Sequence, residues 1–201
     1  MLILIILNQI IHMEAYNPAE LLGDRIKFKF HAAEKQLEKL KEYNKTETMG
    51  ETSEIRVRWE IEIECLLNHL IGAKDALLAR INDKLNLNLP DEDVKLNMIN
   101  SELTKIGKSQ LLQELNNLSS DPNNWYWKLN KARNRGTHGP IFNLQMSRSI
   151  NENVNTGTTT TSSSDSFLFD PRDIVSYLQD SIEDMKKLIG NIMNQEPKLS
   201  V

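Results

Sequence analysis

The sequence predicts an all-α protein, an up-and-down bundle of four to five main helices. Apolar residues recur at three- and four-residue steps through most of the chain, which is the period of an amphipathic helix. No segment alternates apolar and polar residues for long enough to indicate a half-buried strand. The chain has no glycine- or proline-rich hinge between two apolar halves, so we expect a single domain over residues 14–196.

Capping residues and helix breakers divide the chain into elements. Asn17-Pro18 opens a first helix that we expect to run to about Tyr43. A second helix, of about nine turns, begins at Ser53 and ends before Leu89-Pro90. Further helices are expected at 91–106, 109–118, 125–137 and from 170 onwards, separated by Gly107, a turn cluster at 119–124 and Gly139-Pro140.

Two segments fall outside this helical pattern. Residues 1–13 begin with an apolar run far shorter than the about 20 residues that span a bilayer, and they lack the basic flank of a secretory signal. We expect no membrane contact; the run is either a short element against the body or a sign that translation starts at Met13. Residues 151–166 are rich in Asn, Thr and Ser and predict a low-complexity loop, either a linker or a cover over a cleft.

Charge is distributed unevenly. The net charge of −4 argues against a protein that coats nucleic acid through bulk electrostatics. Residues 122–150 nevertheless contain no Asp or Glu, although several cations fall there. Such a window indicates either a site for a small anion or a short stretch of phosphate backbone, or a solvated helix face. The cations are Lys128, Lys131, Arg133, Arg135 and Arg148.

Residues that bind metals or act as nucleophiles are sparse. Cys65 is the single cysteine, so no intrachain disulfide is possible, and this fits a cytoplasmic protein. Its sequence neighbours carry no positive charge that would lower its pKa, so we expect a structural thiol. His12, His31 and His69 show no ligand-like spacing with each other or with Cys65. We therefore expect neither a metal nor a cofactor.

The helix from Trp125 carries the main concentration of reactive side chains, in two stripes set by about 100° per residue. The first stripe, expected to be buried, comprises Trp125, Leu129, Ala132 and Gly136. The second, polar stripe comprises Trp127, Lys131, Asn134 and His138, with Arg135 at its border. One side of this helix therefore packs, and another presents an amide, an imidazole and cations together.

The run Arg133-Asn134-Arg135-Gly136-Thr137-His138 resembles the signature of the HEPN family, in the form R-N-x-x-x-H. In that family the motif lies towards the C-terminal end of a long helix in a compact bundle of four or five helices. The motif is short, but the helical architecture that it implies covers nearly the whole chain. Many HEPN proteins are metal-independent ribonucleases, and others are non-catalytic binding modules.

The resemblance implies RNA as the substrate. The RNA 2′-hydroxyl attacks the adjacent phosphorus and leaves a 2′,3′-cyclic phosphate and a 5′-hydroxyl. This reaction needs a group that moves protons near neutral pH, as imidazole does, and cations around the phosphorane. By resemblance, His138 is the acid/base, Arg133 clamps the phosphate and Asn134 positions either His138 or the phosphate. On geometry alone, Arg135 is a second clamp, because guanidinium donates two parallel hydrogen bonds.

Other groups near the motif are candidates for RNA contacts. Lys128 and Lys131 are suited to phosphates, and Trp127 and Tyr126 to stacking on bases, whereas helical spacing places Trp125 in the core. In the second helix, His69 and Asp75 can contribute polar groups near the motif without being catalytic. A purely structural interpretation stays open, in which His138 is a favourable charge at a helix C-terminus and the two arginines are surface residues or partners of Glu62 or Glu64.

The spacing within the motif predicts an assembly. Arg133 and His138 lie five residues apart, about 140° around an ideal helix. Either Gly136 lets the helix end early, or two chains pair about a twofold axis. We expect a homodimer through this helix, similar to HEPN ribonucleases, in a toxin–antitoxin, defence or RNA-processing role. A nucleotidyltransferase-like antitoxin is a possible partner; the alternative is a non-catalytic helical dimer that binds a protein or a nucleotide.

Overall fold

The computed structural model describes residues 17–46, 52–116, 118, 124–138 and 174–199, except for the side chains of residues 137 and 138. These residues fold as helices without a strand, so the predicted all-α class is confirmed. The α-helices are α2 (Pro18–Gly23), α3 (Arg25–Thr46), α4 (Ser53–Lys84), α5 (Leu96–Lys105), α6 (Ser109–Asn116), α7 (Trp125–His138) and α8 (Ile174–Gln195). Two 3-10 turns are η1 (Asp91–Asp93) and η2 (Pro197–Leu199). The expectations for 1–13 and 151–166 fall outside the described residues.

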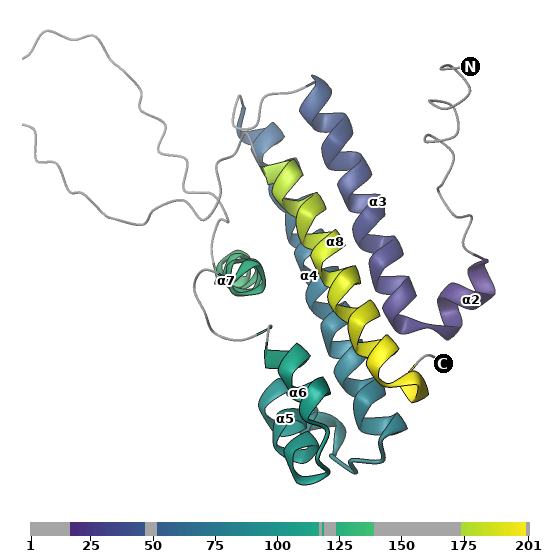
Figure 1. Ribbon diagram of the computed structural model, residues 1–201. Coiled ribbons are helices and arrows are strands. Elements are labelled where there is room, and N and C mark those ends of the chain that lie inside the picture. The colour runs from purple at the N-terminus through teal and green to yellow at the C-terminus, as the bar shows by residue number, and fades with distance from the viewer. Residues whose placement is uncertain (1–16, 47–51, 117, 119–123, 139–173, 200–201) are drawn as a thin grey trace, which may run out of the picture.

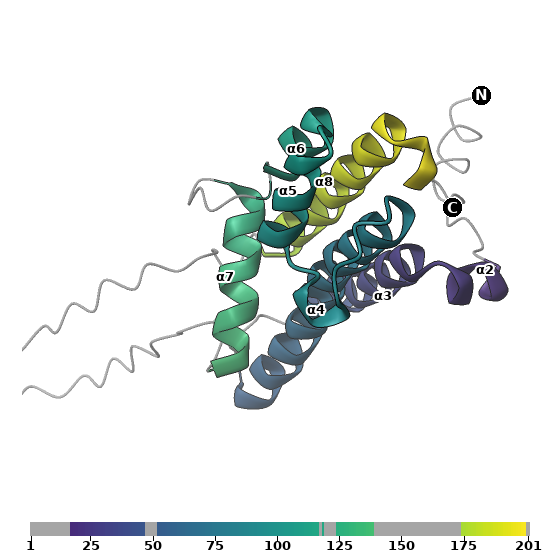
Figure 2. The same ribbon diagram turned by 90° about the horizontal axis from the view of Figure 1, so that it is seen from below.

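Three long helices form the body of the molecule. In Figure 1, α3, α4 and α8 run side by side, and α7 is seen end-on beside them. Figure 2 shows α7 along its own length, lying across α4 and α8, both of which it contacts. The short helices α5 and α6 pack together, and α6 also contacts α8. None of the described helices is both long enough and apolar enough to cross a membrane.

The core follows α4 from end to end. Trp59, Leu66, Leu70 and Leu77 of this helix are fully buried, in step with the three- and four-residue apolar spacing. The stripe of α8 packs onto them and buries nine of its residues, Met185 among them. Burial of one such large apolar side chain contributes about 1.5–3 kcal/mol. α4 is therefore the spine on which the other helices are positioned.

The predicted first helix is in fact two helices. Asn17 caps α2 and Pro18 occupies its first turn, as expected. The chain then breaks at Asp24, whose carboxylate accepts hydrogen bonds from the amides of Ile26 (2.9 Å) and Lys27 (3.2 Å). This carboxylate satisfies the open amides at the start of α3, so it favours a new helix over a continuous one. The break directs α2 away from the axis of α3 (Figure 1).

The remaining boundaries follow local backbone chemistry. α4 ends at Lys84, because Asn86 (φ 51°) and Asn88 (φ 57°) adopt the left-handed conformation that asparagine tolerates better than most residues. The next α-helix begins later than predicted, since Asp91 belongs to the separate turn η1. Gly107, at φ 72°, separates α5 from α6 as the sequence predicts.

Candidate functional site

The apolar face of α7 fixes how this helix lies on the body. Leu129 and Ala132 are fully buried, which confirms the centre of the predicted stripe. Trp125 is half-buried against the core, while Tyr126 has only 6% of its surface exposed. The two rings meet edge-on with their centroids 5.8 Å apart. The expectation that Tyr126 is open to a stacked base is therefore wrong, because α7 is turned so that this ring points into the contact with α4.

Two polar groups hold the first turn of α7. The side chain of Asn124 accepts a hydrogen bond from the amide of Tyr126 at 2.8 Å and so caps the helix. From α8, the hydroxyl of Tyr177 donates to the carbonyl of Trp125 at 3.0 Å. Burial raises the pKa of Tyr177 to about 12, so this hydroxyl keeps its proton at neutral pH. The start of α7 is thus tied to α8.

Arg133 lies at the contact between α7 and α4. Its Nε donates to the side-chain oxygen of Asn68 on α4 at 3.3 Å. Its Nη1 donates to the side-chain oxygen of Asn134, the next residue of the motif, at 3.0 Å. Both acceptors are side-chain amide oxygens, so these two bonds orient the guanidinium. The guanidinium of Arg133 is therefore held at the contact between α7 and α4.

A second polar group lies further along the same contact. Lys74 of α4 is 15% exposed; its ammonium lies 2.6 Å from a carboxylate oxygen of Asp75 and donates to the hydroxyl of Tyr126. Burial raises the pKa of Tyr126, and Asp75 adds to this effect against the opposing charge of Lys74. Burial lowers the pKa of Lys74, but Tyr126 and Asp75 more than offset this, and the net direction is upward. Lys74 is therefore a fixed cation beneath α7, joined to it through a neutral tyrosine.

The outer face of α7 has the predicted polar stripe as far as the side chains are described. The ammonium of Lys131 lies 4.8 Å from the ring centroid of Trp127, within the range of a cation–π contact. Lys131 and Asn134 are exposed, and Trp127 is half-buried. Lys128 and Arg135 are also half-buried.

The helix continues through Gly136 to His138. One of the two expected routes for bringing the motif together, an early end at Gly136, is therefore wrong. The backbone positions of Arg133 and His138 remain about 140° apart around α7. By helical spacing, position 138 continues the stripe of Trp127 and Lys131, whereas Arg133 lies against α4. Within one protomer, these two positions lie on different faces of the helix.

Among protein-family models, curated proteins and solved structures, nothing matches this chain. The HEPN resemblance rests on the six-residue motif in α7 and on the all-α bundle that carries it.

Sequence reasoning missed two residues of the α4–α7 contact. It considered His69 and Asp75 near the motif, and Asp75 does reach this contact through Lys74. Asn68 and Lys74, the immediate sequence neighbours of those two, were not singled out. A signal was present for Asn68, because it lies seven residues before Asp75 and therefore on the same face of the helix.

His69 lies on another side of α4. Burial lowers its pKa, and Lys29 and Arg25 of α3 lower it further. Both of these charged residues lie on α3. The expectation that His69 adds a polar group near the motif stays a prediction.

The remaining reactive candidates behave as structural groups. Burial raises the pKa of the half-buried Cys65 thiol, and the carboxylates of Glu62 and Glu64 raise it further. Such a thiol stays protonated and is a poor nucleophile. Glu62 lies 3.3 Å from the ammonium of Lys39 on α3. Within the ranges that the structure describes, no three His, Cys, Asp or Glu side chains gather closely enough to hold a metal ion.

Proposed function

We propose that the protein is a metal-independent endoribonuclease of the HEPN type that works as a homodimer in the cytoplasm. The observation that carries this proposal is the setting of Arg133. It lies in an R-N-x-x-x-H motif, in a segment without carboxylates, and two amide oxygens orient its guanidinium at the α4–α7 contact. A fixed and permanently charged fork is the group best suited to a phosphate whose charge grows in the transition state.

The proposed reaction uses the nucleophile that RNA carries. The 2′-hydroxyl loses its proton and attacks the adjacent phosphorus, and the 5′-oxygen leaves with a proton. His138 moves these protons, because imidazole titrates near neutral pH. Arg133 holds the non-bridging oxygens, and Asn134 keeps the guanidinium oriented. The products are a 2′,3′-cyclic phosphate and a free 5′-hydroxyl.

The two faces of α7 support the proposal of a dimer. Because Arg133 and position 138 lie about 140° apart on an unbroken helix, one protomer does not aim both at one phosphate. We propose that two protomers pair through α7 about a twofold axis, so that each cleft combines Arg133 of one protomer with His138 of its partner. Lys128, Lys131 and Arg135 then contact neighbouring phosphates, and Trp127 offers a ring to a base. In a toxin–antitoxin role, a nucleotidyltransferase-like protein is the proposed antitoxin.

The test is cleavage of a fluorescent single-stranded RNA in the presence of EDTA. Arg133→Ala and His138→Ala are each expected to lower the rate by at least about a hundredfold. His31→Ala, which removes a histidine from α3, is the matched control and is expected to leave the rate within about twofold. RNA with a 2′-deoxy sugar at the cut site should resist cleavage. Wild-type protein that cuts no RNA, or cuts it equally well in both variants, would overturn the proposal.

A mixing experiment tests the shared cleft separately. Dimers formed from Arg133→Ala and His138→Ala chains contain one cleft with both wild-type groups and one with neither. We expect the mixture to regain activity that neither variant has alone. If both variants are inactive and dimeric but their mixture stays inactive, the motif works within one protomer and the dimer model is wrong.

A further inference from the structure

Three basic side chains gather on the seam between α3 and α4. Arg25 and Lys29 lie one turn apart on α3, and Lys29 lies against Gly72, one turn from His69 on α4. Burial lowers the pKa of His69, and the charges of Lys29 and Arg25 lower it further. Within the described parts of the chain, neither cation forms an ion pair or a hydrogen bond; Arg25 lies over the ring of Phe28 at 4.8 Å. The Nδ1 atom of His69 is shut off from solvent and also has no hydrogen-bond partner there.

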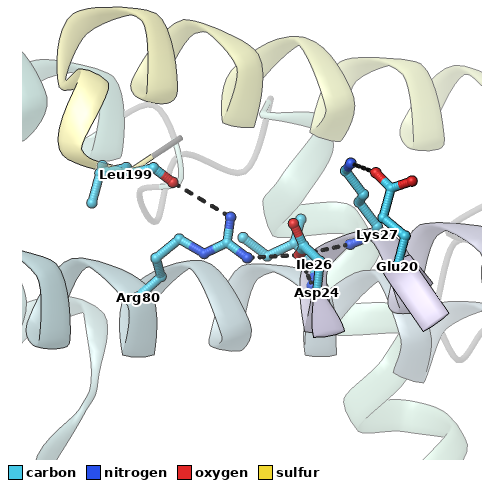
Figure 3. A network of polar contacts seen from close by, with 6 residues as sticks. All are labelled: Glu20, Asp24, Ile26, Lys27, Arg80 and Leu199. Atoms are coloured by element: carbon cyan, nitrogen blue, oxygen red, sulfur yellow. Dashed lines mark hydrogen bonds and ion pairs between the residues drawn. The ribbon is translucent and has the colours of Figure 1, made fainter. Parts of the chain in front are cut away.

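Three cations around this group are paired. Figure 3 shows Arg80 bonded to Asp24 and Lys27 paired with Glu20, at the corner where α2 meets α3. Further along α3, the ammonium of Lys39 lies 3.3 Å from Glu62. In a chain with a net charge of −4, carboxylates are available to neutralise most cations. A group of three like-charged or chargeable side chains left together is electrostatically unfavourable, and an anion between them would relieve it.

Gly72 makes the position of Lys29 possible. A methyl group added to Gly72 would lie 2.9 Å from Cε of Lys29 and 3.1 Å from its Nζ. The lysine therefore lies flat across α4 at this glycine, and its ammonium is held at the seam instead of extending into solvent. Any residue with a side chain at position 72 would displace it.

An open cavity of about 660 Å³ adjoins this group. Arg25 belongs to both, and the small residues Gly23, Ala76 and Ala79 line the cavity further. Charged side chains of both signs complete the lining: Glu20, Asp24, Lys27, Arg80, Asp83 and Lys84. Ala76 lies one turn beyond Gly72 on the same face of α4, so the cavity lies next to the position that Lys29 occupies. The volume is in the range of cavities that hold small organic ligands.

We propose that Arg25, Lys29 and His69 bind the phosphate group of a small phosphorylated ligand, whose remaining part occupies the adjoining cavity. Guanidinium and ammonium together match the double charge of a phosphate monoester, and the imidazole adds a further donor. The site lies on the α3 side of α4 and needs neither Arg133 nor His138, so it stands apart from the proposed nuclease function.

Inorganic phosphate is the first probe, and its binding is measured by NMR of the His69 ring at constant ionic strength. Saturable movement of its resonances is expected. Two variants should each weaken binding at least about tenfold: Lys29→Gln, and Gly72→Ala, which keeps the lysine but fills the space in which it lies. Lys35→Gln is the matched control, because it removes the same charge from α3 at a lysine paired with Glu38. Movement that sodium chloride reproduces, or that both variants leave unchanged, would overturn the site.

Two further probes identify where the phosphate comes from. A nucleoside monophosphate that binds more tightly than inorganic phosphate, with the same dependence on Lys29, supports a small ligand in the cavity. Single-stranded RNA is tested in the Arg133→Ala background, so that the α7 motif does not contribute. The small-ligand proposal would be overturned if RNA displaces phosphate in a Lys29-dependent manner while the nucleoside monophosphate binds no more tightly than inorganic phosphate. The same side chains would then bind an RNA backbone.

Discussion

The polar residues on the two sides of α4 differ in the partners that they contact. Towards α7, Asn68 bonds Arg133, and Lys74 is held between Asp75 and Tyr126. Towards α3, cations at the corner with α2 are paired, but Lys29 lies over Gly72 without a carboxylate partner among the described residues. Lys39, further along the α3 side, is paired with Glu62. The contrast is therefore local: polar bonds hold α7 on α4, whereas the missing partner on the α3 side is confined to the part of the seam around Gly72.

The largest effect is expected from the apolar anchor of α7. Leu129→Ala should lower the free energy of unfolding by about 2–5 kcal/mol, because it leaves a cavity beneath a fully buried side chain. Leu22→Ala is the control, since Leu22 is 75% exposed, and its effect should stay within about 0.5 kcal/mol. Urea denaturation measures both. If the two variants lower the free energy of unfolding by equally small amounts, α7 is not anchored on α4, and the contrast between the two sides of α4 disappears.

A smaller effect is expected from the polar part of the same contact. Tyr126→Phe keeps the ring but removes the hydroxyl that accepts a hydrogen bond from Lys74. The loss should be about 1–2 kcal/mol, because a half-buried ammonium then has one partner fewer. Tyr43→Phe, at a half-buried tyrosine packed on Trp59, is the matched control and should cost less. Equal losses would show that the Lys74 bond does not stabilise the position of α7.

The pair of Lys74 and Tyr126 is expected to make the wild type less stable at alkaline pH. Folding raises the pKa of Tyr126 and that of Lys74, above their ordinary values of 10.0 and 10.5. A raised pKa stabilises the fold while the proton is bound, and this contribution is lost as the pH rises above those values. The stability difference between wild type and Tyr126→Phe should therefore shrink above about pH 10. A difference that grows there would contradict the assigned bond.

The smallest effect is expected on the α3 side. Alanine in place of a helical glycine stabilises by about 0.5–1 kcal/mol where nothing obstructs its methyl group. Gly190→Ala in α8 meets that condition, since nothing lies within 4 Å of the added atom. Gly72→Ala should gain less, because Lys29 must move. Identical thermal shifts for the two variants would show that Lys29 is not confined at this glycine.

The limits of most helices were predictable because each helix carries its own capping or helix-breaking residues. The apolar spacing and the capping residues give α4 and α7 nearly their observed limits, and Gly107 ends its helix as a left-handed glycine should. The break at Asp24 was missed, because an aspartate in an amphipathic pattern usually lies on a solvated face. Its use as a cap depends on the turn of the chain and on Arg80, a residue distant in the sequence.

The site was predictable only as a motif on one helix. Period alone placed Trp125 in the core and left Tyr126 open, although the two positions lie about 100° apart, on either side of the buried Leu129. Which of the two is the more buried is set by contacts with α4 and α8, including Lys74 and Tyr177, which no spacing within α7 reveals. Cross-helix partners such as Asn68 depend on the crossing of two helices. The sequence of either helix alone does not contain that information.

Asp24 also links the two ends of the described chain. Burial raises its pKa, but the bond from Arg80 and the amides of α3 outweigh this, so the carboxylate is held below its usual pKa. Arg80 donates as well to the carbonyl of Leu199, at 3.4 Å (Figure 3). Fraying of the last turn should therefore release Arg80 and speed hydrogen exchange in the first amides of α3. A tag or truncation at the C-terminal side thus becomes a disturbance at the opposite end of the polypeptide.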